Sequence, residues 1–244
     1  MPRRPPGSRT DSIWHRQAPA PSRSASSPAF SREEITKAAI ELADSHGLEA
    51  VSMRRIADRI GSAPTSIYWY VSDKSELYEL MFDAVLGEVE LPGWSARDWR
   101  ADLSSLAWAM LATARRHRWW YSQVSIQPVP GPNTLRYSAV MLPILAKSGI
   151  DETTGVNVLA TLHNYIVGFT QREAAWQRLA TSPAADGTSE ADSVNGSGQQ
   201  AGDPPVAAPW VSDRLRLAGD ESFRFGLELF LDGIAVLVDS LGRA

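Results

Sequence analysis

The sequence predicts an all-α protein in which an N-terminal three-helix unit contains a helix-turn-helix and a larger helical domain follows. Three observations lead to this prediction. Apolar residues recur every three or four positions through most of the chain, as they do on one face of a helix. No segment alternates apolar and polar residues in the manner of a set of strands. Capping residues, prolines and glycines separate the helical stretches.

Composition divides the 244 residues into three parts. Residues 1–30 are rich in Pro, Ser, Ala and Arg, and we predict a disordered basic arm because they can bury little apolar surface. Residues 31–91 are predicted to form the helix-turn-helix domain, which ends at a Pro-Gly pair. Residues 92–244 are predicted to form a second helical domain for ligand binding and dimerisation, with a flexible loop at 181–209.

The first two helices are recognised by their ends. Ser31 and Glu34 have the S-x-x-E spacing of a capping box, so the first helix is predicted to begin there and to stop at Gly47. The second helix is predicted to open at Ser52 and to close at Gly61. The apolar residues of both segments follow the helical period, which predicts that each helix buries one face.

A very short third helix is predicted to begin at Pro64, because the missing N–H of proline costs nothing at the first helical position. Asp73 and Glu76 are predicted to form the capping box of a fourth helix. Further helices are expected near residues 95–118, 119–127, 132–147, 152–179 and 220–241.

Two short helices joined by a tight turn with a glycine are typical of a helix-turn-helix. The third helix can pack inward through Ile67 and still offer polar and aromatic side chains to a DNA groove. We expect Lys74 to meet a phosphate and Arg54 to reach the edge of a guanine. The alternative, an aromatic core cluster at residues 68–70, is disfavoured because consecutive helical residues point about 100° apart.

The run from Ser31 to Leu80 resembles the DNA-binding domain of the TetR (tetracycline repressor) family. The matching stretches are Ala38–Leu42, Gly47–Ala50, Ser52–Ala57, Gly61, Ile67–Val71, Asp73–Lys74 and Leu77. The resemblance implies DNA contacts by Arg54, Pro64, Thr65, Ser66, Tyr68, Trp69, Tyr70 and Lys74. We add Ser52, at the start of the second helix, to this set.

The segment Phe223–Phe230, followed by Gly233, resembles the last helix of a tetracycline-repressor-type regulatory domain. In that family the helix pairs with the long helix before the loop in a dimeric four-helix bundle. The resemblance therefore implies a dimer interface, for which we select Leu162, Ile166, Phe223, Gly226, Phe230 and Gly233. Packing within one chain is the alternative explanation of the same apolar faces.

Nine tryptophans are present, and most of them follow the domain boundary. Aromatic residues with a few polar ones predict an apolar site for a drug-like ligand, for which we select Trp108, Trp120, Tyr121, Val124, Asn164, Phe169 and Arg172. Plain core packing is the alternative for each tryptophan alone. The tetracycline repressor holds a magnesium–drug chelate through a histidine and a glutamate, where this chain has Val124 and Arg172, so no metal is expected.

The basic arm is predicted to be a second DNA-binding element. The chain has a net charge of −4, yet residues 1–30 contain five arginines and a single aspartate. Arginines of a flexible arm can follow the phosphates or enter a narrow minor groove. The residues concerned are Arg3, Arg4, Arg9, Arg16 and Arg23. An inert tail is the competing interpretation.

Other function classes find little support. The chain has no cysteine, and its four histidines lack the H-x-x-x-H spacing of a metal site. No nucleophile–base pair or phosphate loop indicates an enzyme, and no cofactor is expected. A structural DNA-bending protein would usually carry positive net charge. Neither a signal peptide nor an apolar stretch of roughly 18 residues is visible, so a cytoplasmic location without a membrane partner is expected.

These interpretations combine into one functional expectation. The resemblance implies a ligand-responsive transcriptional repressor that binds a palindromic double-stranded operator as a homodimer. A small hydrophobic or drug-like effector is expected to release it from DNA. An activator would have the same fold, because the fold does not determine the sign of regulation.

Overall fold

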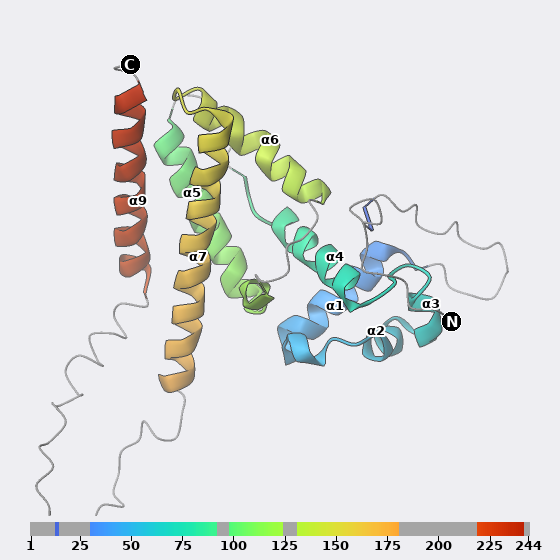
Figure 1. The fold of residues 1–244 in the computed structure, drawn as a ribbon. Coiled ribbons are helices and arrows are strands. Elements are labelled where there is room, and N and C mark those ends of the chain that lie inside the picture. The colour runs from blue at the N-terminus through green and yellow to red at the C-terminus, as the bar shows by residue number, and fades with distance from the viewer. Residues whose placement is uncertain (1–12, 15–29, 92–97, 124–130, 181–218, 242–244) are drawn as a thin grey trace, which may run out of the picture. The chain divides into compact units, whose positions relative to one another are not determined.

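The computed structural model describes residues 13–14, 30–91, 98–123, 131–180 and 219–241 (Figure 1). Within these ranges all regular secondary structure is helical, α or 3-10, and no strand occurs. The all-α prediction is confirmed. None of the helices in the described ranges has the length and apolar character needed to cross a membrane.

The N-terminal helices begin and end where the capping residues predict. They are α1 (Arg32–His46), the 3-10 helix η2 (Leu48–Ala50), α2 (Met53–Ile60), α3 (Pro64–Ile67) and α4 (Lys74–Gly87). Ser31 and Glu34 make both bonds of the predicted capping box. Gly61 ends α2 with φ of 69°, a left-handed conformation that glycine adopts without a steric penalty.

One predicted cap differs in detail. The Asp73 carboxylate accepts hydrogen bonds from the N–H groups of Ser75 and Glu76, as an N-cap should. The Glu76 carboxylate, however, accepts from the N–H of Ser72 and not from that of Asp73. The predicted capping box is therefore corrected to an Asp73 cap with a separate bond one residue earlier, which the long glutamate side chain can reach.

The core of the helix-turn-helix region consists of β-branched and leucine side chains. Ile35 of α1, Ile56 of α2, Ile67 of α3 and Leu77 of α4 are completely buried. Burial of such a side chain contributes roughly 1.5–3 kcal/mol. Because α3 contains only four residues, its attachment depends strongly on Ile67.

The later helices also agree with the sequence periodicity. They are α5 (Trp99–Arg116), η3 (Trp120–Gln123), α6 (Pro132–Ala146), α7 (Glu152–Ala180) and α9 (Asp220–Leu241). The expected helix at 119–127 is instead a 3-10 turn over Trp120–Gln123, and residues 124–127 lie outside the described ranges. The expected loop at 181–209 also lies outside them.

The chain forms two compact units, Met1–Asn157 and Val158–Ala244. In the first unit, the helix-turn-helix region packs on α6 through α4, and α5 also contacts α6. In the second unit, the Tyr165 hydroxyl of α7 donates to the carbonyl of Phe223 in α9 at 2.6 Å. A Cβ at Gly226 would lie 2.5 Å from that hydroxyl, so Gly226 permits the close approach of the two helices.

Candidate DNA-binding surface and its connection to the core

Two large aromatic side chains are exposed in the turn that directly follows α3. Tyr68 is 54% exposed and Trp69 is 75% exposed, whereas their neighbour Ile67 is completely buried. Tyr70 is half-buried, and its ring lies 5.3 Å from that of Phe30. The three consecutive aromatics thus point in different directions, and two of them are exposed next to α3, the helix that a helix-turn-helix places in the major groove.

The remaining residues of the predicted DNA-binding set lie on α2, α3 and the start of α4. Arg54, Thr65 and Lys74 are exposed, and the Lys74 ammonium lies 5.3 Å from the centre of the Tyr78 ring. Pro64 is exposed as the first residue of α3, and Ser66 is half-buried. The Ser52 hydroxyl caps α2 by accepting from the N–H of Arg55. The arginines of the basic arm lie outside the described residues.

Asp83 joins α4 to α6. The N-cap of α6 is Gly131, which has no side chain to satisfy the first N–H groups of the helix. The buried carboxylate of Asp83 takes this role: it accepts from the backbone N–H groups of Asn133 (3.1 Å) and Thr134 (2.9 Å). It also accepts from the Asn133 amide and the Thr134 hydroxyl, both at 3.0 Å. A carboxylate at this position also lies at the positive end of the helix dipole, where acidic side chains stabilise a helix.

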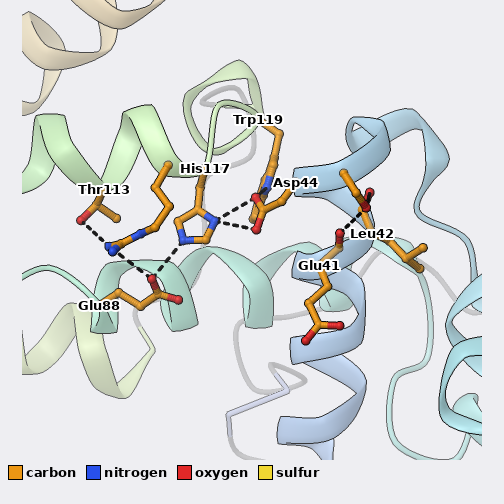
Figure 2. Close-up of polar contacts among 9 residues, drawn as sticks. Glu41, Leu42, Asp44, Glu88, Thr113, His117 and Trp119 are labelled. Atoms are coloured by element: carbon orange, nitrogen blue, oxygen red, sulfur yellow. Dashed lines mark hydrogen bonds and ion pairs between the residues drawn. The ribbon is translucent and has the colours of Figure 1, made fainter.

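His117 joins α5 to both α1 and α4 (Figure 2). Its Nδ1 lies 2.9 Å from the Asp44 carboxylate and its Nε2 lies 3.0 Å from the Glu88 carboxylate. A ring nitrogen that carries a hydrogen donates to the carboxylate that it faces. The imidazole at the C-terminal end of α5 therefore lies between a carboxylate of α1 and the carboxylate that follows α4.

An aromatic cluster continues from this joint. Trp119 donates from its indole Nε1 to the Asp44 carboxylate at 2.7 Å. The ring of Phe82, on α4, lies 6.4 Å from Trp119 and 6.3 Å from Trp120. The rings of Trp120 and Tyr121 lie 4.6 Å apart. The cluster therefore connects η3 directly to α1 and α4.

The indole nitrogen of Trp120 is a buried polar atom of this cluster. Trp120 is buried, and among the described residues its indole N–H finds no hydrogen-bond acceptor. Burial also raises the pKa of the Tyr121 phenol, with a smaller contribution from Tyr137, so the phenol stays neutral. A buried donor without a partner lowers the stability of a protein by about 1–3 kcal/mol. A bound molecule with a hydrogen-bond acceptor could satisfy this donor.

The other predicted effector residues are distributed over both units. Trp108 is half-buried on α5 in the first unit. In the second unit Phe169 is buried, with the exposed Arg172 guanidinium 5.3 Å from its ring centre, and Asn164 is exposed. Val124 lies outside the described residues. No group of three histidine, aspartate or glutamate residues suited to a metal ion occurs in the described part of the chain.

The predicted interface residues fall into two groups. Leu162, Ile166 and Phe223 are completely buried within the single chain, as the alternative of intramolecular packing requires. Phe230 is half-buried, and Gly226 contacts Tyr165 as described above. Gly233 is exposed, and a Cβ added there would have no described atom within 4 Å. The outer face of α9 is formed by Phe225, Leu229, Gly233 and Val236, which follow one another at spacings of four, four and three.

Sequence reasoning missed three features of the first unit. They are the Asp83 cap of α6, the bonds of His117 to Asp44 and Glu88, and the docking of part of the basic arm (residues 1–30, hereafter the leader). Ile13 is completely buried and Trp14 is half-buried, although composition predicts disorder for the whole of residues 1–30. The prediction is corrected for these two residues, whose large apolar side chains were the available signal. For Asp83, the signal was an acidic residue next to the apolar stripe of α4.

Comparison with known proteins gives a consistent picture. Residues 35–81 match the family "Bacterial regulatory proteins, tetR family", and residues 91–238 match "Tetracyclin repressor-like, C-terminal domain". An HTH-type transcriptional regulator of Saccharopolyspora erythraea is 33% identical over 68% of this chain and 69% of its own length. The HTH-type transcriptional repressor DrrR1 of Streptomyces coeruleorubidus is 32% identical over 86% of this chain and 79% of its own.

A solved structure has the same fold. The crystal structure of ActR, a protein of Streptomyces coelicolor, in complex with actinorhodin superposes with a TM-score of 0.63 at 21% identity. The superposition covers 86% of this chain and 99% of that one. At this identity the likeness concerns the arrangement of helices alone.

Proposed function

This chain belongs to the TetR family of bacterial transcriptional regulators, which are not enzymes, and we propose that it is a cytoplasmic repressor released from DNA by a small molecule. In this proposal it binds a palindromic operator as a homodimer. The observation that carries the proposal is the exposure of Tyr68 and Trp69 directly after α3, beside a buried Ile67 that anchors the helix.

Exposure of two large aromatic side chains next to each other, at the end of a four-residue helix, is costly in water unless a partner covers them. Arg54 and Lys74, on the neighbouring helices, supply positive charge where phosphates and guanine edges would lie. Thr65 and Ser66 add hydrogen-bonding groups on α3 itself. This combination of exposed polar, cationic and aromatic groups favours the major groove of DNA over an apolar protein partner.

For the effector, we propose a planar apolar molecule that carries a hydrogen-bond acceptor. The indole N–H of Trp120, which has no acceptor among the described residues, would donate to that acceptor, and the rings of Tyr121 and Phe82 would supply the apolar wall. ActR, which has the same fold, was crystallised with actinorhodin. The departures at Val124 and Arg172 support an effector held without a metal chelate.

The aromatic cluster also offers a route from effector to DNA. A molecule bound at Trp120 would press on Phe82 of α4 and on Trp119, which is bonded to Asp44 of α1. Both helices belong to the helix-turn-helix region. An effector that fits only a displaced arrangement of these groups would lower operator affinity by the difference between its affinities for the two arrangements.

For the dimer, we propose the outer face of α9 as part of a two-fold interface. Phe225, Leu229 and Val236 are each more than half exposed on this face. Monomeric proteins seldom expose a contiguous apolar patch of this kind, and a two-fold axis lets one patch cover its own copy. A dimer would then present two α3 helices to the two halves of a palindrome.

Two measurements test the proposal. Fluorescence anisotropy with duplex DNA from the region beside the chain's own gene should show tight, salt-sensitive binding, and a reporter placed behind that DNA should be repressed. A thermal-shift screen of planar aromatic compounds should then find one that stabilises the protein and releases the DNA. Tight binding that raises reporter expression would identify an activator, and absence of DNA binding would contradict the proposal.

A further inference from the structure

Two residues of the leader are built into the first unit. Ile13 is completely buried, and its carbonyl accepts a hydrogen bond from the Arg32 guanidinium of α1 at 3.3 Å. Trp14 follows it and is half-buried. Figure 1 shows the pair as a short blue segment near the start of α6.

Trp14 lies where α4 meets α6. A Cβ added to Gly131, the N-cap of α6, would lie 2.6 Å from Cζ2 of the Trp14 ring, and the Asp83 carboxylate is at least as close. Trp14 also lines a cavity of about 680 Å³ together with Thr36 and Ile40 of α1 and Leu80 and Ala84 of α4. The pair therefore lies beside all three helices that meet at this joint.

The same guanidinium connects the leader to the recognition region. Arg32 donates through Nη1 to Ile13 and through Nε to the carbonyl of Tyr70, at 3.2 Å. Tyr70 comes three residues after Ile67, the anchor of α3. Docking of the leader and placement of the chain that follows α3 thus share one side chain.

We infer that Ile13 and Trp14 form a clamp that holds α1, α4 and the start of α6 in one arrangement and thereby sets operator affinity. The inference rests on the proposed DNA-binding function. A dimer must present its two recognition helices about one helical turn of DNA apart, so freedom between the helix-turn-helix region and α6 lowers the fraction of molecules able to bind.

The clamp differs from a DNA-contacting arm in a measurable way. A leader that touches phosphates releases counterions on binding, so its removal makes log Kd depend less steeply on log salt. A clamp inside the protein touches no phosphate. Its loss should weaken operator binding by a similar factor at every salt concentration and leave the salt slope unchanged.

The experiment compares four full-length proteins: the wild type, Trp14→Ala, Trp14→Phe and Leu135→Ala. Leu135 is an exposed apolar residue of α6, so its replacement controls for loss of apolar surface near the joint. Operator affinity is measured by anisotropy at several salt concentrations with DNA from beside the chain's own gene. Hydrogen exchange at the Asn133 and Thr134 amides, which bond to Asp83, reports on the joint without DNA.

We expect Trp14→Ala to weaken operator binding roughly tenfold at constant salt slope, as when the binding-competent fraction falls to about a tenth. Trp14→Ala should also speed hydrogen exchange at both amides. Trp14→Phe should regain most of the wild-type affinity and most of the wild-type protection from exchange. Leu135→Ala should resemble the wild type in both measurements. Unchanged exchange in Trp14→Ala, affinity within twofold of the wild type, or a flattened salt slope would each overturn the clamp. A wild type that binds no DNA while Trp14→Ala still speeds exchange would refute the proposed function and leave the docking intact.

Discussion

The Asp83 carboxylate of α4 accepts a hydrogen bond from the backbone N–H of Thr134 at 2.9 Å, and so caps α6 from another helix. Most N-caps are local, like that of Asp98 on α5, which accepts from Arg100 and Ala101. A cap from another helix also fixes the position of one helix relative to the other, because the capping bond is made only while α4 and α6 keep their relative position. Stability of α6 and placement of the helix-turn-helix region are therefore coupled through one side chain.

Asp83→Ala should lower the free energy of unfolding by about 2–3 kcal/mol, because it removes a cap and leaves partly buried N–H groups without their acceptor. Asp98→Ala, the matched local cap, should cost only about 1 kcal/mol. Urea denaturation measures both values. Equal costs for the two variants would contradict the view that the Asp83 bonds join two helices.

His117→Ala should weaken the communication between effector and operator. The substitution removes the imidazole that the Asp44 and Glu88 carboxylates share, so α5 loses its bond to Asp44 of α1 and is left with the Arg116–Glu88 ion pair at 3.4 Å. Both carboxylates are partly exposed, so the loss of stability should be only about 1–2 kcal/mol. The measured quantity is the ratio of operator Kd with and without an effector found by the thermal-shift screen.

The expected result for His117→Ala is a smaller ratio, with effector affinity in the absence of DNA nearly unchanged. His46→Ala is the control, because His46 is exposed at the end of α1. A ratio equal to that of the wild type would show that coupling bypasses His117.

Glu79→Gln should stabilise the protein at neutral pH. Desolvation first, and then the charges of Glu76 and Asp73, raise the pKa of the Glu79 carboxyl above its ordinary value of 4.5. The folded state therefore holds this proton more tightly than the unfolded state, and stability falls as the pH rises through the raised pKa. In Glu79→Gln this fall in stability should be absent, and the free energy of unfolding at pH 7 should be about 0.5 kcal/mol higher than in the wild type. The gain is small because the site is partly solvated.

Chemical denaturation at pH 4.5 and at pH 7 checks the Glu79 prediction. Glu90→Gln, at an exposed position of the same part of the chain, should show no such difference. A loss of stability at pH 7 in Glu79→Gln would mean that the ionised carboxylate has a favourable partner.

The sequence was sufficient for the N-terminal helices and for the side of α3 that is buried, because both depend on local chemistry. Caps, the helical period and Pro64 predict the bounds of α1 to α4, and Ile67 with its aromatic neighbours predicts which side of α3 is buried. The side-chain bonds that connect one helix to another were not predictable in this way. Asp83 and Thr134 are 51 positions apart, and His117 and Asp44 are 73 apart, so their bonds exist only once helices have packed.

The face of α9 illustrates a different difficulty. Phe223 and Phe225 are both large and apolar, and helical spacing places each on its own apolar stripe. Periodicity reveals two stripes without stating which one the chain buries against its own α7. The structure buries Phe223 and exposes Phe225, and this difference depends on how Tyr165 and Gly226 meet.

Substitutions on the recognition surface should separate two kinds of DNA contact. Lys74→Ala should weaken binding to all sequences and reduce the salt slope by about 1, as expected for one lost phosphate contact. Arg54→Ala should instead relax discrimination at one base pair by roughly 1–3 kcal/mol. Tyr68→Ala should weaken operator binding without unfolding the protein, because Tyr68 is largely exposed.

Anisotropy titrations on operator and scrambled DNA distinguish these effects. Lys147→Ala provides the lysine control, since Lys147 is exposed at the other end of α6. Operator affinity unchanged in all three surface variants would remove the DNA-binding assignment of this surface.

A matched pair of leucines tests the dimer. Leu229 on α9 and Leu135 on α6 are both 59% exposed, so a glutamate at either position meets the same amount of water in the isolated chain. If the outer face of α9 lies in a two-fold interface, Leu229→Glu buries two unpaired charges in each dimer, at a cost of about 3 kcal/mol or more. That cost corresponds to a dimer dissociation constant at least about a hundredfold larger.

Sedimentation should then show Leu229→Glu as a monomer and Leu135→Glu as a dimer. Operator binding by Leu229→Glu should be weakened. If Leu229→Glu sediments as a stable dimer, the interface lies on another surface and the outer face of α9 requires a different partner.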